Sequence, residues 1–184
     1  MARLFAGGWP EFIFHDQQTK RHIGRVRELF CDLELVLLDG DEIVAAGWAV
    51  PLRSGQGPGG QLLLALRNLA DQPRWPRVIC PVRPTLKVRY PLTPIGRYIE
   101  WTRPDGAPLD PWIRTHWRLG ARVLAPAPQS QVITGTVEEW QTWTGLAFPD
   151  SGDYIIPDSL STLHIDRDND QGIYIEPNVW MQHQ

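Results

Sequence analysis

The stretch LRSGQGPGGQLLLALRNLAD, residues 52–71, joins a glycine-rich turn to a leucine-rich helical pattern. Four glycines and one proline fall within residues 55–60, and leucines follow at helical spacing over residues 61–70. The first amides of a helix have no partner within that helix, and glycines let a phosphate approach the backbone closely. The stretch therefore predicts an anion site at the start of a helix. A linker with no bound anion is the alternative, because such glycines also arise in plain loops.

Two common phosphate motifs do not fit this stretch. No Lys-Ser or Lys-Thr pair follows the glycines, as a P-loop requires. Residues 55–60, GQGPGG, have the GxGxxG spacing, but no acidic residue follows a second strand, so a dinucleotide-binding fold is not indicated.

The composition of the 184 residues is that of one globular protein, with 42% hydrophobic and 21% charged residues and a net charge of -3. Without a basic run, nucleic acid is not an expected partner. The chain has no apolar stretch of the ~18 residues that a membrane span needs, and its first residues do not form a secretory signal. Cys31 and Cys80 lie far apart and belong to no CxxC pair, so the expected location is the cytoplasm.

Local patterns predict the elements before the glycines. Residues 11–16 alternate as in a short strand, and Asp16 is placed to cap a helix that follows. Residues 33–38 and 42–50 flank the dipeptide Asp39-Gly40, which favours a tight hairpin turn. The β-branched, apolar run RVICPV, residues 77–82, predicts a strand inside the sheet.

The second half of the chain begins with a proline-rich segment, residues 81–111, that we expect to wrap the surface. Residues 110–120 predict a helix capped by Asp110 and stopped by Gly120. Residues 121–128 and 130–137 read as two strands, followed by a helix capped at Thr136. Short strands are expected at residues 153–157 and 172–177.

With its glycine loop, the chain resembles the GNAT superfamily of acyl-CoA transferases, in which a Q/R-x-x-G-x-G/A loop holds the CoA pyrophosphate. Gly55 and Gly57 match the two motif glycines, Leu52 stands at the Gln/Arg position, and Arg53 is placed to cover for it. THWRLGARVL, residues 115–124, is similar to the closing Y-x-x-x-G-F turn of the superfamily, with Ala121 at the position where an aromatic residue is common. The residues that the resemblance assigns to CoA binding are Arg53, Gly55, Gln56, Gly57, Gly59 and Gly60.

The resemblance implies an α/β fold whose central mixed, mostly antiparallel sheet is flanked by helices, with a short irregular or β C-terminal extension. The expected division is a GNAT-like domain over residues 1–145 and an extension over residues 146–184 packed on the same domain. The chain also looks similar to GNAT-like proteins of actinobacteria in ICPVRPTLKVRYPLTPIGRY and YIEPNVWMQHQ, a likeness that carries no assigned chemistry.

One departure from the GNAT pattern lies just before the glycines. Only residues 51–54 separate the second arm of the hairpin from Gly55, where the family has a splayed fourth strand that pairs with pantetheine. Either the second arm takes over this task, or the segment is lost and the cofactor site is compromised.

The resemblance places the acid that protonates the leaving thiolate on a Tyr after the strand RVICPV. Tyr90 is the closer match and Tyr98 the other, and a phenol pKa of ~10 allows proton donation to a thiolate. Among His116, Asp110 and Glu100, we select His116 as the base because its ordinary pKa of ~6.5 suits the task. A packed Tyr and a packed His remain the alternatives at these positions.

No metal is expected from the sequence. His164-Ile165-Asp166 forms half of an iron facial triad without a third ligand, since His183, the later histidine, lies close to the end of the sequence. Residues 166–177 begin like a calcium loop but carry Gln171 at position 6 and Pro177 at position 12. A polar turn between strands explains the acidic cluster, and Cys31 and Cys80 are expected to be buried structural residues.

The resemblance implies an acyltransferase that moves an acyl group from acetyl-CoA or another acyl thioester to a small-molecule amine. The alternatives are a catalytically inactive GNAT-like scaffold that binds a ligand or partner, and an enzyme that uses the fold for another acyl-thioester reaction. The expected partners are a small-molecule acceptor, an acyl-carrier protein as a second source of the acyl group, and a second copy in a homodimer.

Overall fold

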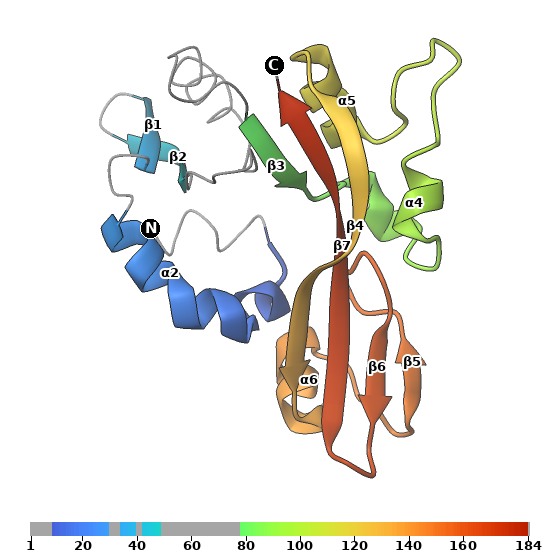
Figure 1. Ribbon diagram of the computed structural model, residues 1–184. Coiled ribbons are helices and arrows are strands. Elements are labelled where there is room, and N and C mark those ends of the chain that lie inside the picture. Colours follow the sequence, from blue (N-terminus) through green and yellow to red (C-terminus); the bar gives the residue numbers. More distant parts are fainter. Residues whose placement is uncertain (1–8, 30–33, 40–41, 49–77, 184) are drawn as a thin grey trace.

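The computed structural model describes residues 9–29, 34–39, 42–48 and 78–183, with residues 34–39, 42–48 and 78 described as backbone only. It has a mixed α/β architecture in which helices flank an open, antiparallel sheet (Figure 1). This architecture is the predicted fold class and is consistent with a GNAT-like fold. The glycine loop and the helix expected at residues 61–70 lie outside the described residues.

The N-terminal part begins with a 3₁₀ helix, η1 (Glu11–His15), where a strand was expected. Phe12 and Ile13 are both buried against the core, and a 3₁₀ turn places consecutive side chains there more readily than an alternating strand. Helix α2 (Gln17–Leu29) follows, and Asp16 caps it as predicted, because its Oδ1 accepts a hydrogen bond from the amide of Gln18 at 2.9 Å.

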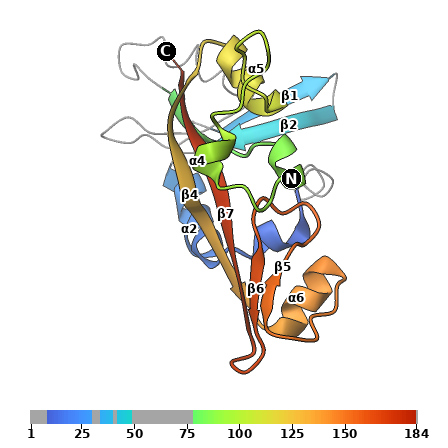
Figure 2. The same cartoon turned by 90° about the vertical axis from the view of Figure 1, so that its right-hand side faces the viewer.

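The predicted hairpin is confirmed. Strands β1 (Glu34–Asp39) and β2 (Glu42–Trp48) pair antiparallel on either side of residues 40–41. They form a two-stranded sheet of their own, separate from the main sheet and behind it in the view of Figure 2.

The main sheet is organised around β7 (Gln171–His183), which is antiparallel to each of its partners. One edge of β7 pairs with β4 (Arg122–Gly135) along most of its length. The other edge pairs with β3 (Val78–Val82) at its C-terminal end and with β6 (Leu163–Asp166) at its N-terminal end. Strand β5 (Gly152–Tyr154) adds to β6. Figure 1 shows β7 running the full height of the sheet between these partners.

Strand lengths depart from the sequence-based expectation. The two strands expected at residues 121–128 and 130–137 are one strand, β4, with an irregularity between Ala127 and Gln131. Likewise, the short strand expected at residues 172–177 extends to His183. Pro177 has no N–H, yet it falls opposite the irregular part of β4, so the strand continues through it without losing a ladder hydrogen bond.

Strand β3 is also placed differently from the prediction, which put it inside the sheet. Among the described strands it pairs with β7 alone, so it is an edge strand there. Its apolar character reflects burial instead, because Ile79, Cys80 and Val82 are all buried.

Four short helices follow β3 and β4: η3 (Leu86–Arg89), α4 (Ile95–Tyr98), α5 (Pro111–Arg118) and α6 (Val137–Thr144). The caps of α5 and α6 are those predicted. Asp110 accepts from the amides of Trp112 and Ile113, and Thr136 and Glu139 form a reciprocal capping box.

Within the part of the chain that the structure describes, the apolar core has two parts, one at each end of the sheet. The first lies under α6 and η1, and its buried members are Phe12, Ile13, Ile133, Val137, Trp140, Phe148, Ile156, Leu163, Ile165 and Tyr174. The second lies under α4 and α5, and its buried members are Cys80, Val82, Ile95, Tyr98, Ile113, Ala121, Val179 and Met181. Strand β7 contributes to both parts, so residues 171–183 are integral to the main sheet. The division at residues 145 and 146 stays a prediction.

None of the helices in the described part of the chain is long and apolar enough to span a bilayer.

Candidate functional site

The second core encloses a cluster of one cysteine and two histidines, Cys80, His116 and His183. In the β3–β7 pairing, Cys80 lies opposite Met181 and Val78 lies opposite His183. Paired residues and residues two apart point to the same side of a sheet, so Cys80 and His183 share a face. His116, in the last turn of α5, reaches the same cluster and is buried together with Cys80 and His183.

Short contacts join the three side chains of this Cys-His-His cluster. Nδ1 of His116 lies 3.1 Å from Nε2 of His183 and 3.8 Å from Sγ of Cys80. All three donor atoms lie within 4.8 Å of one another. The group therefore forms a compact triangle of nitrogen and sulfur atoms inside the protein.

Burial sets the protonation of this cluster. It raises the pKa of the Cys80 thiol to about 12. Burial and, secondarily, the neighbouring His183 lower the pKa of His116 to about 4. At neutral pH Cys80 is therefore a thiol and His116 a neutral imidazole, so Cys80 lacks the thiolate character of a cysteine nucleophile.

Local structure holds the His116 ring in place. The edge of the ring meets Trp112 with centroids 4.8 Å apart. The backbone carbonyl oxygen of His116 accepts hydrogen bonds from the amides of Leu119 and Ala121. These bonds end the helix at the turn around Gly120. Gly120 has a φ of 85°, which a glycine adopts without strain.

The predicted acid, Tyr90, lies in a different group of side chains. Its ring packs edge-on against Trp101 at 5.0 Å and near Tyr98 at 6.2 Å, and 39% of the residue is exposed. Tyr98, the other candidate, is buried and donates to Oδ2 of Asp110 at 2.8 Å; burial and this hydrogen bond raise its pKa. Tyr90 is thus the more accessible phenol, and no direct contact links it to His116.

The other two residues considered as bases have structural partners. Asp110 is buried, where it caps α5 and accepts from Tyr98. Glu100 is exposed and forms an ion pair with Arg97 at 3.4 Å.

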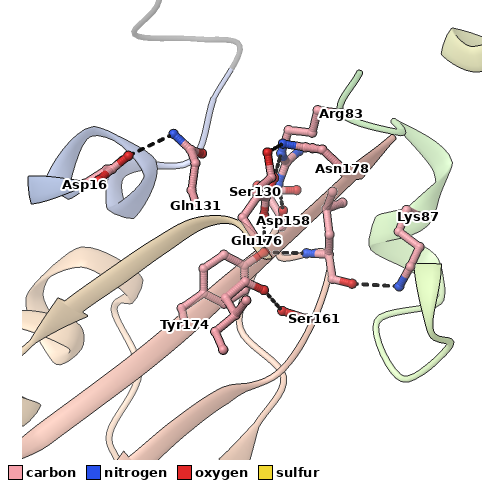
Figure 3. A network of polar contacts seen from close by, with 12 residues as sticks. Asp16, Arg83, Lys87, Ser130, Gln131, Asp158, Ser161, Tyr174, Glu176 and Asn178 are labelled. Carbon is pink, nitrogen blue, oxygen red and sulfur yellow. Dashed lines mark hydrogen bonds and ion pairs between the residues drawn. The ribbon is translucent and has the colours of Figure 1, made fainter. Parts of the chain in front are cut away.

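A second buried polar group, which the sequence analysis missed, crosses the middle of β7 (Figure 3). Glu176 is fully buried, and its Oε1 accepts from Nε of Arg83 at 2.5 Å. Its Oε2 accepts from the hydroxyl of Tyr174, which in turn accepts from the amide of Leu160 at 2.9 Å. Burial raises the pKa of Glu176, and the charge of Arg83 opposes that rise. The alternation of Tyr174, Glu176 and Asn178 along one strand face was the signal that could have revealed this group.

This polar group ties separate loops to the sheet. Arg83 also donates to the carbonyl of Asp158 at 2.6 Å. Lys87, likewise buried, donates to the carbonyls of Tyr90 and Leu160, each at 2.7 Å. These bonds anchor the loop between β5 and β6 to the segment that follows β3.

An open pocket of about 670 Å³ adjoins Lys87. It lies between residues 91–96, the proline-rich middle of β4 and strand β7, and its lining includes Leu92, Ile95, Pro126 and Ile175. The lining is mainly apolar, as in pockets that bind small molecules.

The two metal motifs weighed in the sequence have ordinary partners. His164 is exposed and pairs with Asp153 across β5 and β6 at 2.9 Å. Asp166 opens the turn between β6 and β7, where its side chain accepts from Asn169. This is the predicted polar turn between strands.

Seven of the candidate site residues and cysteines named in the sequence analysis lie outside the described residues. They are Cys31, Arg53, Gly55, Gln56, Gly57, Gly59 and Gly60. The assignment of the last six to CoA binding therefore stays a prediction.

Comparison with known proteins adds one relative. The chain is 32% identical over 146 residues to a protein named arginine N-acetyltransferase avaD, from Aspergillus versicolor. The match covers 70% of this chain and 50% of the relative, so the chain spans about half the length of the curated relative it matches. No family model and no solved structure matches the chain. The likeness to actinobacterial proteins stays a prediction.

Proposed function

We propose that this chain is an N-acyltransferase that moves an acyl group from acetyl-CoA, or another acyl thioester, to a small-molecule amine. The observation that carries the proposal is the 32% identity to a protein named as an arginine N-acetyltransferase. The antiparallel sheet flanked by helices, which is consistent with a GNAT-like fold, supports it independently of that name.

In the proposed reaction, the amine nitrogen attacks the thioester carbonyl carbon. A C–N bond forms and the C–S bond breaks, while the amine loses a proton to a base and the departing thiolate gains one from an acid. The glycine loop at residues 55–60 would bind the pyrophosphate of CoA through backbone amides at the start of the following helix.

The acceptor pocket that we propose is the one beside Lys87. Residues 91–96, which line it, belong to the proline-rich segment. Arginine is the first acceptor to test because the relative is named for it.

For the acid we propose Tyr90, whose partly exposed ring can meet a substrate.

His116 remains the proposed base, and its buried ring would reach a substrate once neighbouring side chains moved. Comparing His116→Gln with His183→Gln separates the role of a base from a purely structural role. If His116 is the base, His116→Gln should lower kcat far more than His183→Gln does. If the cluster has one shared role, the two variants should lower kcat by similar amounts.

The test of function is CoA thiol release from acetyl-CoA in the presence of arginine and a panel of other amines. The proposal predicts amine-dependent release, with the acylated amine identified by mass spectrometry. Tyr90→Phe should then lower kcat by about 100-fold with little change in KM, as expected for loss of a general acid. CoA binding without turnover of any amine would favour the inactive scaffold instead. Cytoplasmic location, a carrier-protein donor and a homodimer stay predictions.

A further inference from the structure

Three buried donor atoms from distant parts of the sequence converge in the Cys-His-His cluster. They come from an edge strand, a helix and the last described residue of the central strand, at positions 80, 116 and 183. Among the described residues, this is the group in which cysteine, histidine or carboxylate donors gather closely enough to share one metal ion.

Two of the three donor separations are close to those around a tetrahedral metal ion, and the third, between Sγ of Cys80 and Nε2 of His183, is within 4.8 Å. With Zn–S bonds of about 2.3 Å and Zn–N bonds of about 2.0–2.1 Å, neighbouring donors in a tetrahedron lie about 3.3–3.6 Å apart. The observed separations are 3.1 Å between the histidine nitrogens and 3.8 Å from Nδ1 of His116 to Sγ of Cys80. Shifts of a few tenths of an ångström would bring these two edges to the ideal values.

The chemistry of the donors selects the class of metal. One thiolate and two imidazoles suit Zn²⁺ and related transition metals, whereas Mg²⁺ and Ca²⁺ require oxygen ligands. Side chains already fixed by packing lose little further freedom on binding, and these three are fully or almost fully buried.

We propose that Cys80, His116 and His183 bind one divalent transition-metal ion, with Zn²⁺ as the expected occupant, through Sγ, Nδ1 and Nε2. With three protein donors, the fourth position is left for water or a small ligand. Binding forms the metal–sulfur bond as the thiol gives up its proton to solvent, so one proton is released for each ion bound. The ion fastens the end of β7 to β3 and α5.

This site does not rest on the proposed acyl transfer, but the two share His116: with Nδ1 bound to the ion, that nitrogen cannot accept a proton, so metal-bound His116 is not the base. It revises the expectation of no metal, which was based on two other segments, residues 164–166 and 166–177. Sequence spacing did not reveal it because the three donors meet only after β7 pairs with β3 and α5 packs over them.

The test uses Co²⁺ as a spectroscopic substitute for Zn²⁺. The full chain is stripped with a chelator and titrated with Co²⁺, both when folded and during refolding from urea, because the donors are buried. The proposal predicts saturation at one equivalent, with the thiolate-to-cobalt charge-transfer band and tetrahedral visible bands, both displaced by Zn²⁺. Titration in buffers of different ionisation enthalpy should show one proton released.

Variants locate the site. Cys80→Ser should abolish the charge-transfer band, and His183→Asn should weaken Co²⁺ binding by about 100-fold or more, since even outer partners of ligands are worth 10–100-fold. Cys31→Ser and His164→Gln are the matched controls and should bind as wild type does. If Cys80→Ser does not fold, judged by circular dichroism, His183→Asn decides in its place. Absence of stoichiometric binding in wild type, or unchanged binding in His183→Asn, would overturn the proposal and leave the cluster as hydrogen-bonded side chains alone.

Discussion

Two facing glycines make room for the tryptophans of α6. Gly135 and Gly172 pair across β4 and β7. A Cβ added at Gly172 would lie 2.2 Å from Cδ1 of Trp140, and one at Gly135 would lie 2.6 Å from Cη2 of Trp143. Trp140 is fully buried, and its Nε1 donates to the carbonyl of Gly172 at 3.0 Å. The close contact between the Trp140 ring and the backbone of Gly172 therefore helps to hold α6 against the sheet.

Gly172→Ala should destabilise the fold by about 1–3 kcal/mol, because the added methyl overpacks a core whose ring cannot move away. Gly24→Ala, at a helical position of α2 where a Cβ meets nothing within 4 Å, should instead stabilise by up to about 1 kcal/mol. Urea denaturation of both variants measures the difference. Equal stability of Gly172→Ala and wild type would show that Trp140 is not held as described.

Single residues with local roles were predictable from the sequence. Asp16, Asp110 and Thr136 cap helices through partners two or three positions away, so the pattern of nearby residues was sufficient. Cys80 could not be assigned to a histidine in the same way. Its neighbours in the fold, His116 and His183, are brought to it by tertiary packing, which leaves no trace in local spacing.

At the scale of elements, Asp110 joins α5 to two other segments. Its Oδ1 caps the helix, while its Oδ2 accepts from the amide of Leu86 and the hydroxyl of Tyr98, both at 2.8 Å. The residue is buried, so each of these donors depends on it for a partner. The cap was predictable, but its bonds to η3 and α4 were not.

Asp110→Ala should therefore cost more than loss of a helix cap. We expect destabilisation of roughly 3 kcal/mol or more, since a cap is worth ~0.5–2 kcal/mol and each buried donor left unpaired costs ~1–3 kcal/mol. Thr136→Ala removes the cap of α6, whose side-chain bonds are local, and should cost about 1 kcal/mol. Comparable losses in the two variants, measured by thermal or urea unfolding, would contradict the joining role of Asp110.

Strand lengths were the least predictable feature of the elements. Pro128 and Pro177 stand at the ends of the strands expected at residues 121–128 and 172–177, and proline has no N–H for a ladder hydrogen bond. Pro128 and Pro177 instead fall at the irregularity between β4 and β7, where the ladder is already interrupted, so both strands continue past them. A sequence pattern cannot show such a coincidence, because it depends on which two strands pair and in which register.

At the scale of the whole molecule, a buried charge, that of Lys87, joins the segment after β3 to the loop between β5 and β6. Lys87 is buried between the carbonyls of Tyr90 and Leu160, and burial lowers its pKa to about 8, against an opposing effect of Glu176. In the unfolded chain the pKa of a lysine is ~10.4. Between these two values the unfolded chain holds more of this proton than the folded one does. The contribution of Lys87 to the free energy of unfolding therefore rises with pH across that window.

Lys87→Met tests whether the contribution of Lys87 to the free energy of unfolding rises with pH. The free energy of unfolding of wild type minus that of Lys87→Met should increase as the pH rises from about 8 to about 10.5, because each pKa unit corresponds to ~1.4 kcal/mol. Urea denaturation at several pH values measures the difference, and titrating groups unaffected by the substitution cancel from it. A difference that stays constant or falls with pH would show that Lys87 is not held in a desolvated site.

The central claim for the whole molecule is that it binds an acyl-CoA through the glycine loop. Calorimetric titration of CoA into wild type and Gly57→Asp tests this most directly, because a carboxylate at residue 57 would repel the pyrophosphate. Gly24→Asp, which adds the same charge at an exposed position of α2, is the matched control. We predict binding to wild type and Gly24→Asp, with affinity at least about tenfold lower in Gly57→Asp, a change of ~1.4 kcal/mol. No binding to wild type, or equal affinity in all three proteins, would contradict the account.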